Sequence, residues 1–373
     1  MKDEKYVMCK GFYGLGGNLA VLVCALRLSK KLNRKLIVDW EGSNFSLSNG
    51  DIFKELFEEP IDIAPPRVEW GGLKVFPEYW QDFIKYPKPY SSEYPLTRAT
   101  VDMAEELDEN ELKEIDIIVV SRDDKYWHKA DYFDEISALM KLVVPMGFIR
   151  DRVERFENEF LKNNSIGVHF RHGNGENSVV PPDINWFYSA IDEFLGKFGD
   201  ASIFLCTDCS AVEDVFRNRY GDKVVVWEKI FPILGSGTMQ FVEGDENRLN
   251  SAVGAIMDMW TLSKCTCFVG SRSFFSGVAG RLNKGLDKDH SRWWVPKYRS
   301  HSKKENQQYV SEIPVVEKYF NEENVLTDGI LLEETTDGSY DVIYLYENVG
   351  HIDDLTNFNI EPIRERIKCH RLY

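Results

Sequence analysis

Strand and helix signals alternate through the second half of this chain, and this alternation limits the possible folds more than any other feature. Short β-branched and aromatic runs are followed by longer segments with apolar residues at helical spacing, in the order 166–170, 186–197, 202–206, 211–220, 223–227, 249–263, 267–269 and a helix from 273. Such alternation predicts a mostly parallel sheet with helices on both faces. The chain also begins with a strand, a helix and a strand, at 6–10, 19–32 and 35–40.

The sequence therefore predicts an α/β protein with two Rossmann-like domains. Its 373 residues, 43% of them hydrophobic, are enough for two cores. The pair Asn163-Asn164 breaks a helix, so we expect an N-terminal domain at 1–163, a second domain at 164–305 and an extension at 306–373. In the extension, Asp337-Gly338 lies between two strand-like runs and predicts a β-hairpin. Residues 42–110 are rich in proline and aromatic side chains without a regular period, which predicts long ordered loops.

Charge and composition exclude several classes of function. A formal net charge of −16 argues against broad binding to nucleic acid or to anionic membranes. The chain has no apolar run long enough to cross a bilayer and no recognisable signal peptide, so we expect a cytoplasmic protein or a catalytic fragment without its anchor. Seven scattered cysteines predict reduced thiols. A zinc site at Cys206, Cys209, Cys265 and Cys267 is the less favoured alternative, because both pairs lie in or beside apolar strands.

Polar residues gather where the strand at 166–170 ends and glycines release the chain into a turn. They are His169, Arg171, His172, Asn174 and Glu176. Ligands of open α/β sheets bind outside the carboxyl ends of the strands, so this exit is a candidate site. Arg171 suits an anionic ligand, because its planar fork binds phosphate or carboxylate oxygens and stays charged. The alternative is that Arg171 pairs with a nearby carboxylate and the histidines only cover the sheet edge.

Other segments are expected to contribute to the same kind of site. Thr207 and Asp208 follow the strand at 202–206 and open at the same edge. The loop that contains Ser271, Ser273 and Phe274 precedes a helix, where free N–H groups bind phosphate. An ordinary N-cap by Ser271 or Ser273 is expected there as well. In the first domain the turn before the helix contains Gly14, Gly16, Gly17 and Asn18. Its glycines allow a ligand to approach the backbone.

Taken in this order, the segments resemble those of a known family. The chain is similar, over roughly residues 6–285, to the rhizobial nodulation α1,6-fucosyltransferases and to their relatives, the eukaryotic core α1,6-fucosyltransferases. The His169-Phe-Arg171 segment is the most specific element, and the bacterial enzymes are the more similar. The resemblance implies a glycosyltransferase of the GT-B type, with two Rossmann-like domains facing a cleft. It also implies an inverting, metal-independent enzyme with GDP-fucose as donor and an oligosaccharide or glycoconjugate as acceptor.

The resemblance further implies roles for individual residues. His169 and Asp258 would bind guanosine, Arg171 the β-phosphate, and the loop at 271–276 the diphosphate, while the glycine turn of the first domain would close over the donor. From spacing alone, the favoured interpretation is that Asp258 pairs with a neighbouring arginine or lysine. Glu176 is the expected general base, because it lies in the same loop as the arginine that would neutralise the leaving group.

Two departures from the family pattern leave the donor open. The chain has His172 where the eukaryotic enzymes have a second arginine, and Cys209 where they have a second aspartate. Another nucleotide sugar as donor, or an inactive glycan-binding protein on the same scaffold, are therefore the alternatives. We expect no metal, although Asp287-Lys-Asp289 has the spacing of metal-using transferases, because it lies outside the matched segments.

Overall fold

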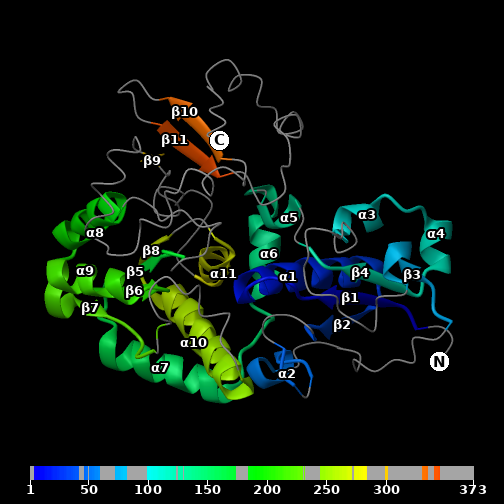
Figure 1. Cartoon of the computed structure of the whole chain (residues 1–373), viewed down its shortest axis with the longest axis horizontal. Coiled ribbons are helices and arrows are strands. Elements are labelled where there is room, and N and C mark those ends of the chain that lie inside the picture. Colours follow the sequence, from blue (N-terminus) through cyan, green and yellow to red (C-terminus); the bar gives the residue numbers. More distant parts are fainter. Residues whose placement is uncertain are drawn as a thin grey trace. The chain divides into compact units, whose positions relative to one another are not determined.

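The computed structural model describes residues 4–41, 46–48, 50–58, 72–81, 99–122, 125–128, 130–173, 184–229, 231, 244–270, 273–283, 299–300, 330–334 and 340–344. The protein has the α/β architecture with parallel sheets that the alternating pattern predicts (Figure 1). The chain divides into two compact units. The first comprises Met1–Glu159, Gln240–Lys264 and Ser273–Asp289, and the second comprises Phe160–Met239, Cys265–Arg272 and His290–Tyr373.

The first unit is built on a parallel sheet with the strand order β2-β1-β4-β3. Its strands are β1 (Tyr6–Lys10), β2 (Lys35–Asp39), β3 (Val75–Phe76) and β4 (Ile117–Val120). Tyr6 and Met8 pack with Trp80 in a buried cluster on one face, so the alternate residues of β1 face the opposite side. Strand β1 lies at the centre of the sheet, and the long helix α1 (Leu15–Leu32) leads from it to the edge strand β2.

The first unit contains further helices. They are α2 (Phe53–Leu56), α3 (Val101–Glu105), α4 (Glu109–Glu114), α5 (Lys125–His128), α6 (Phe133–Met140), α7 (Gly147–Phe160), α10 (Asp245–Lys264) and α11 (Phe274–Leu282), with 3-10 turns η1 (Glu78–Trp80) and η3 (Ala130–Tyr132). The prediction that 42–110 is irregular was therefore wrong for α2, β3, α3 and the start of α4. A capping box begins α4, because Asp108 and Glu111 accept each other's backbone N–H groups. This Asp-x-x-Glu pattern is a helix-start signal that the sequence contains.

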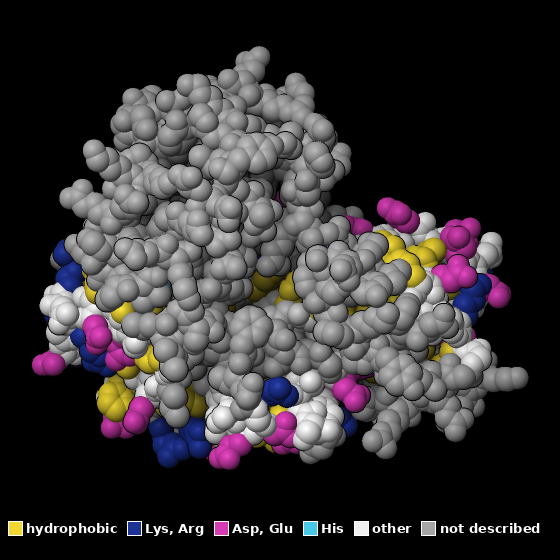
Figure 2. All heavy atoms as spheres, viewed as in Figure 1, with side chains coloured by type: hydrophobic (Ala, Val, Ile, Leu, Met, Phe, Trp, Pro, Cys, Tyr) yellow, Lys and Arg dark blue, Asp and Glu magenta, His cyan; other side chains and the backbone are white. Residues whose placement is uncertain are grey.

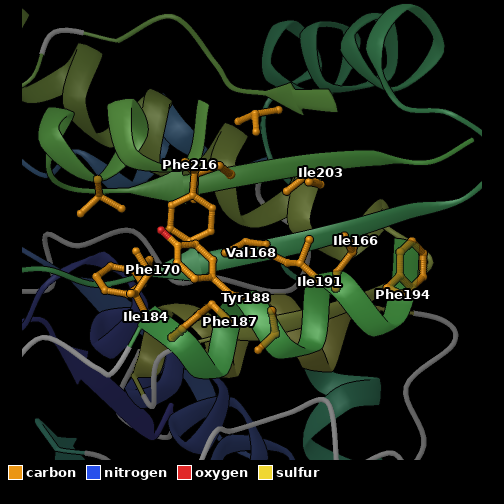
Figure 3. Close-up of a cluster of buried hydrophobic side chains, with 14 of the residues drawn as sticks. Ile166, Val168, Phe170, Ile184, Phe187, Tyr188, Ile191, Phe194, Ile203 and Phe216 are labelled. Carbon is orange, nitrogen blue, oxygen red and sulfur yellow. The ribbon is translucent and has the colours of Figure 1, made fainter. Parts of the chain in front are cut away.

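The second unit is built on a parallel sheet with the order β7-β6-β5-β8. Its strands are β5 (Ser165–Phe170), β6 (Ser202–Thr207), β7 (Val224–Val225) and β8 (Cys267–Gly270). Helices α8 (Ile184–Lys197) and α9 (Ser210–Tyr220) follow β5 and β6, and the 3-10 turn η4 (Gly221–Lys223) leads into β7. The core lies between the strands and these helices, where Phe170 packs against Phe187 of α8 and Phe216 of α9 (Figure 3).

Helices α10 and α11 belong to a different unit from the one that the sequence predicts. A boundary at 163 assigns both helices to the second domain, whereas they pack within the first unit. The Arg281 guanidinium of α11 stacks 3.8 Å from the Trp127 ring centroid, and Trp260 of α10 contacts Phe57 at 6.1 Å between ring centroids. These side chains are far apart in sequence, so no local pattern indicates that they meet.

Three short strands form an antiparallel sheet near the end of the chain. Strand β11 (Tyr340–Tyr344) pairs with both β10 (Ile330–Glu334) and β9 (Arg299–Ser300). The turn expected at Asp337-Gly338 and most of the extension at 306–373 lie outside the described residues.

On the face of the molecule in Figure 2, acidic and basic side chains of the described residues are interspersed. In the part of the chain that the structure describes, no helix is both long enough and apolar enough to cross a bilayer.

Candidate functional site

The exit of β5 is the point at which the strand order of the second sheet reverses. In order of appearance along the chain the four strands lie 3-2-1-4, and β5 is the first of them, flanked by β6 and β8. Ligands of open α/β sheets bind at such a reversal, beyond the carboxyl ends of the strands. His169 is the penultimate residue of β5 and is buried, while Arg171 follows the strand directly and is half-buried. The structure thus places both residues at the expected edge.

Asp208 binds the backbone at this exit. Its Oδ1 accepts a hydrogen bond from the His172 N–H at 2.7 Å, and its Oδ2 accepts one from the Gly173 N–H at 2.8 Å. Gly173 has a φ of 82°, in the left-handed region that favours glycine. From the sequence, Asp208 is expected to bind the nucleotide sugar. In the structure, both of its carboxylate oxygens accept hydrogen bonds from the backbone that follows Arg171.

His172 lies inside the protein rather than on the edge of the sheet. The residue is 0% exposed. Burial lowers the pKa of its imidazole, an effect that the nearby Asp208 charge opposes. The ring is therefore neutral near neutral pH and supplies no positive charge for a phosphate. The position at which the eukaryotic relatives are expected to carry a second arginine is uncharged here.

Two further residues lie at the described part of this edge. Thr207 is buried at the end of β6, and its Oγ1 accepts from the Cys209 N–H at 3.3 Å. Lys229, which the sequence analysis did not select, donates from Nζ to the Thr207 carbonyl oxygen at 3.4 Å. Because β7 is parallel to β6, a lysine shortly after β7 opens at the same edge, and the rule of strand exits could have found it. Lys229 places a positive charge at an edge where His172 supplies none.

In the first unit the glycine-rich segment starts a helix earlier than expected. Helix α1 begins at Leu15 with Gly14 as its N-cap, so Gly16, Gly17 and Asn18 lie within its first turn. A Cβ on Gly16 would lie 2.6 Å from the backbone nitrogen of Phe275, near the start of α11. The glycine is thus required for the close approach of two helix N-termini. Both N-termini carry the positive ends of their helix dipoles, the arrangement that favours a phosphate.

Ser273 and Phe274 lie at the start of α11, as the sequence predicts. Ser273 is the N-cap, and its Oγ accepts from the Ser276 N–H at 3.3 Å, so the capping interpretation of this serine is confirmed. The Phe274 ring lies 6.2 Å from the ring centroids of both Tyr13 and Trp127. This packing fixes the start of α11 next to the segment that precedes α1.

Asn18 and Asp258 are both buried in the first unit. Asn18 is 0% exposed, and its Oδ1 accepts from the Tyr13 N–H at 2.9 Å, which braces the glycine-rich segment from inside. Asp258 is 7% exposed on α10, between the buried Met257 and Met259. A carboxylate in such apolar surroundings needs a polar or charged counterpart. Asn174, Glu176, Ser271 and Asp287-Lys-Asp289 lie outside the described residues.

The described cysteines are free thiols. Burial raises the pKa of the Cys209 thiol, which makes it unreactive near neutral pH. Among the described residues, no group of three or more His, Cys, Asp or Glu side chains could hold a metal ion.

Asp51 anchors the segment that follows β2 and provides a test of the first unit. Its Oδ2 accepts from the Trp40 N–H at 2.8 Å and its Oδ1 from the Phe53 N–H at 2.7 Å. Burial raises the pKa of Asp51 to about 6, and the charges of Asp39 and Glu41 also raise it. Between its ordinary pKa of 3.8 and about 6, the folded protein keeps a proton that the unfolded chain has lost. Protonated Asp51 therefore contributes to the free energy of unfolding at low pH, and this contribution is lost as the pH rises through the range.

We expect the free energy of unfolding of the wild type, relative to Asp51→Asn, to fall by about 2–3 kcal/mol between pH about 4 and about 7. Urea unfolding of both proteins over this range measures the difference. Asp200→Asn is the control, because Lys162 lowers the pKa of Asp200, which then titrates below the range. A pH profile that Asp51→Asn leaves unchanged would contradict the assignment.

Two parallel sheets with polar side chains at their carboxyl ends define a Rossmann-like α/β protein of the kind that binds nucleotides. Within this class, the chain belongs to the nodulation protein Z (NodZ) family, whose sequence model matches residues 3–279. The family expected from the sequence motifs is thereby confirmed.

Individual relatives agree with this assignment. The chain is 29% identical to nodulation protein Z of Azorhizobium caulinodans over 293 residues, which cover 72% of this chain and 85% of the relative. It is 26% identical to nodulation protein Z of Sinorhizobium fredii over 285 residues, with 70% and 85% covered. Its fold matches the crystal structure of NodZ α-1,6-fucosyltransferase soaked with GDP-fucose, with a TM-score of 0.53 and 20% identity over 75% of this chain and 93% of the other.

Proposed function

We propose that this protein is a GDP-fucose-dependent fucosyltransferase that moves fucose to a hydroxyl of a glycan acceptor. The observation that carries the proposal is the position of Arg171 at the reversal point of the second sheet, in a chain that belongs to the NodZ family. An arginine at this point can bind the oxygens of a diphosphate. Solved NodZ structures, one soaked with GDP-fucose and one co-crystallised with GDP, support the choice of donor.

We assign the donor contacts from the resemblance to the family, one unit at a time. In the second unit, His169 would bind the guanosine and Arg171 the β-phosphate. In the first unit, Asp258 would bind the guanine edge, and the start of α11 at Ser273 would bind the diphosphate. The close approach of Gly16 to α11 supports the last role, because it brings the positive ends of two helix dipoles together.

The reaction would be a direct displacement that inverts the anomeric carbon. Glu176 takes the proton of the acceptor hydroxyl, whose oxygen attacks C1 of the fucose, and the bond from C1 to the β-phosphate oxygen breaks. The electron pair of that bond leaves with GDP. Arg171 neutralises the developing charge on the diphosphate, so the mechanism needs no metal ion. Lys229, with its ammonium at the same sheet edge as Thr207, adds a second positive charge there.

Calorimetric titration in EDTA tests the donor. We expect GDP to bind without added metal, and UDP and ADP to bind more weakly, because the buried polar groups that suit guanine are left unpaired by other bases. Preferential binding of UDP or ADP would replace the fucose donor with another nucleotide sugar.

Transfer to a panel of oligosaccharides, with the anomeric configuration of the product read by NMR, tests the reaction itself. An inverted product formed equally well with and without EDTA is the expected result. If GDP-fucose binds but no acceptor receives fucose and the donor is not hydrolysed, the protein is an inactive glycan-binding protein on the transferase scaffold.

A further inference from the structure

We propose that Asp208 is a positioning residue, whose carboxylate holds the backbone after β5 and so fixes the direction of Arg171. The inference rests on the proposed function, in which Arg171 binds the donor diphosphate. It gives Asp208 a role different from the nucleotide contact expected from the sequence.

The geometry places Asp208 next to the residue that it would position. Strands β5 and β6 are paired in register up to Phe170 and Thr207, so Arg171 and Asp208 are the next residues along two adjacent strands. The two carboxylate oxygens accept from two successive backbone N–H groups, those of His172 and Gly173, at 2.7 and 2.8 Å. Hydrogen bonds to an ionised carboxylate are shorter and stronger than neutral ones.

Arg171 is therefore held from both sides along the chain. On one side, Phe170 is fixed in the sheet and buried in the core of the second unit. On the other side, the Asp208 carboxylate fixes the two peptide N–H groups that follow, and Gly173 adopts the left-handed conformation that this turn requires. A long flexible arginine gains most from a fixed backbone, because the direction of its Cα–Cβ bond decides where the guanidinium can reach.

The same contacts adapt Asp208 to a site for an anion. A bare carboxylate next to an arginine would repel a phosphate or pair with the guanidinium itself. Two N–H donors share the negative charge of Asp208 instead, and the buried imidazole of His172 stays neutral behind them.

Amide hydrogen exchange tests the carboxylate contact without any ligand. In Asp208→Asn we expect the His172 and Gly173 amides to exchange about tenfold faster than in the wild type, because one acceptor oxygen and the negative charge are lost. Asp200→Asn is the matched control. Asp200 precedes the amino end of the same strand β6 and pairs with Lys162 on the surface, so it should leave both amides unchanged. Equal exchange in Asp208→Asn and wild type would overturn the proposed contact.

A double-mutant cycle with GDP tests the effect on Arg171. Asp208→Asn is expected to weaken GDP binding about tenfold in the wild-type background and less than about twofold in the Arg171→Ala background, because Asp208 acts through Arg171. In the transfer assay, kcat should fall more than KM rises, because the arginine acts mainly on the leaving group. A merely structural role would lower the melting temperature without this pattern.

The remaining outcomes separate the two proposals. An equal loss of GDP affinity in both backgrounds, or no loss in either, overturns the positioning role. Failure of the wild type to bind GDP overturns the proposed function and the positioning role with it, whereas the exchange experiment still decides whether Asp208 holds the backbone.

Discussion

Arg171→Ala is expected to weaken GDP binding by about tenfold or more and to lower the rate of fucosyl transfer by about a hundredfold or more. The residue follows β5 at the reversal point of the second sheet, where a guanidinium can contact a diphosphate bidentately. The effect on rate exceeds the effect on binding, because negative charge on the diphosphate increases as the bond to fucose breaks. Calorimetry with GDP in EDTA and steady-state kinetics with GDP-fucose measure the two effects.

Arg171→Lys distinguishes charge from shape. Lysine keeps the positive charge but lacks the planar fork, so a loss intermediate between wild type and alanine is expected. Arg217→Ala is the matched control in the same unit, since Arg217 pairs with Glu213 along the surface of α9. GDP binding that Arg171→Ala leaves at the wild-type level would mean that the sheet edge holds another ligand, and nucleotides other than GDP would then be tested against the same variants.

Gly16→Ala is expected to destabilise the protein by about 3 kcal/mol, because the added methyl group meets backbone that cannot move aside. The Cβ would lie 2.6 Å from the Phe275 nitrogen and 2.9 Å from the carbonyl carbon of Phe274. Either α1 or α11 must shift, which disturbs the packing of both helices. Thermal and urea unfolding of the variant measure this loss.

Gly254→Ala is the control for glycine replacement in a helix of the same unit. A Cβ at Gly254, in the interior of α10, meets nothing within 4 Å, so alanine is expected to stabilise the protein by about 0.5–1 kcal/mol through its helix propensity. If both variants were equally stable, α1 and α11 would not approach each other through Gly16.

Much of the sheet edge could be predicted before the structure, because strand exits are local features. The run at 166–170 has the β-branched and aromatic composition of a buried strand, and β5 spans Ser165–Phe170. The residues that follow it were therefore placed at the right edge of the sheet. Asn174 and Glu176, outside the described residues, stay predictions, as does the nucleotide contact of His169.

Other features could not be predicted, because they depend on which polar groups meet in space. His172 directly follows Arg171 in the chain after β5. It is nevertheless buried and neutral, while Arg171 is half-buried. The rule of strand exits could have placed Lys229 at the edge, but its hydrogen bond to the Thr207 carbonyl oxygen depends on the pairing of β7 with β6.

The sequence by itself determined the α/β class, the run of most strands and helices, and the family, because each of these depends on residue patterns within short segments. Only the tertiary structure decided that α10 and α11 pack in the first unit, that Gly16 admits the start of α11, and that Asp208 binds the backbone of its neighbouring strand exit. These contacts join residues from 35 positions apart to more than 200. Packing and hydrogen bonding across such separations are set by the folded chain as a whole, and no local pattern specifies them.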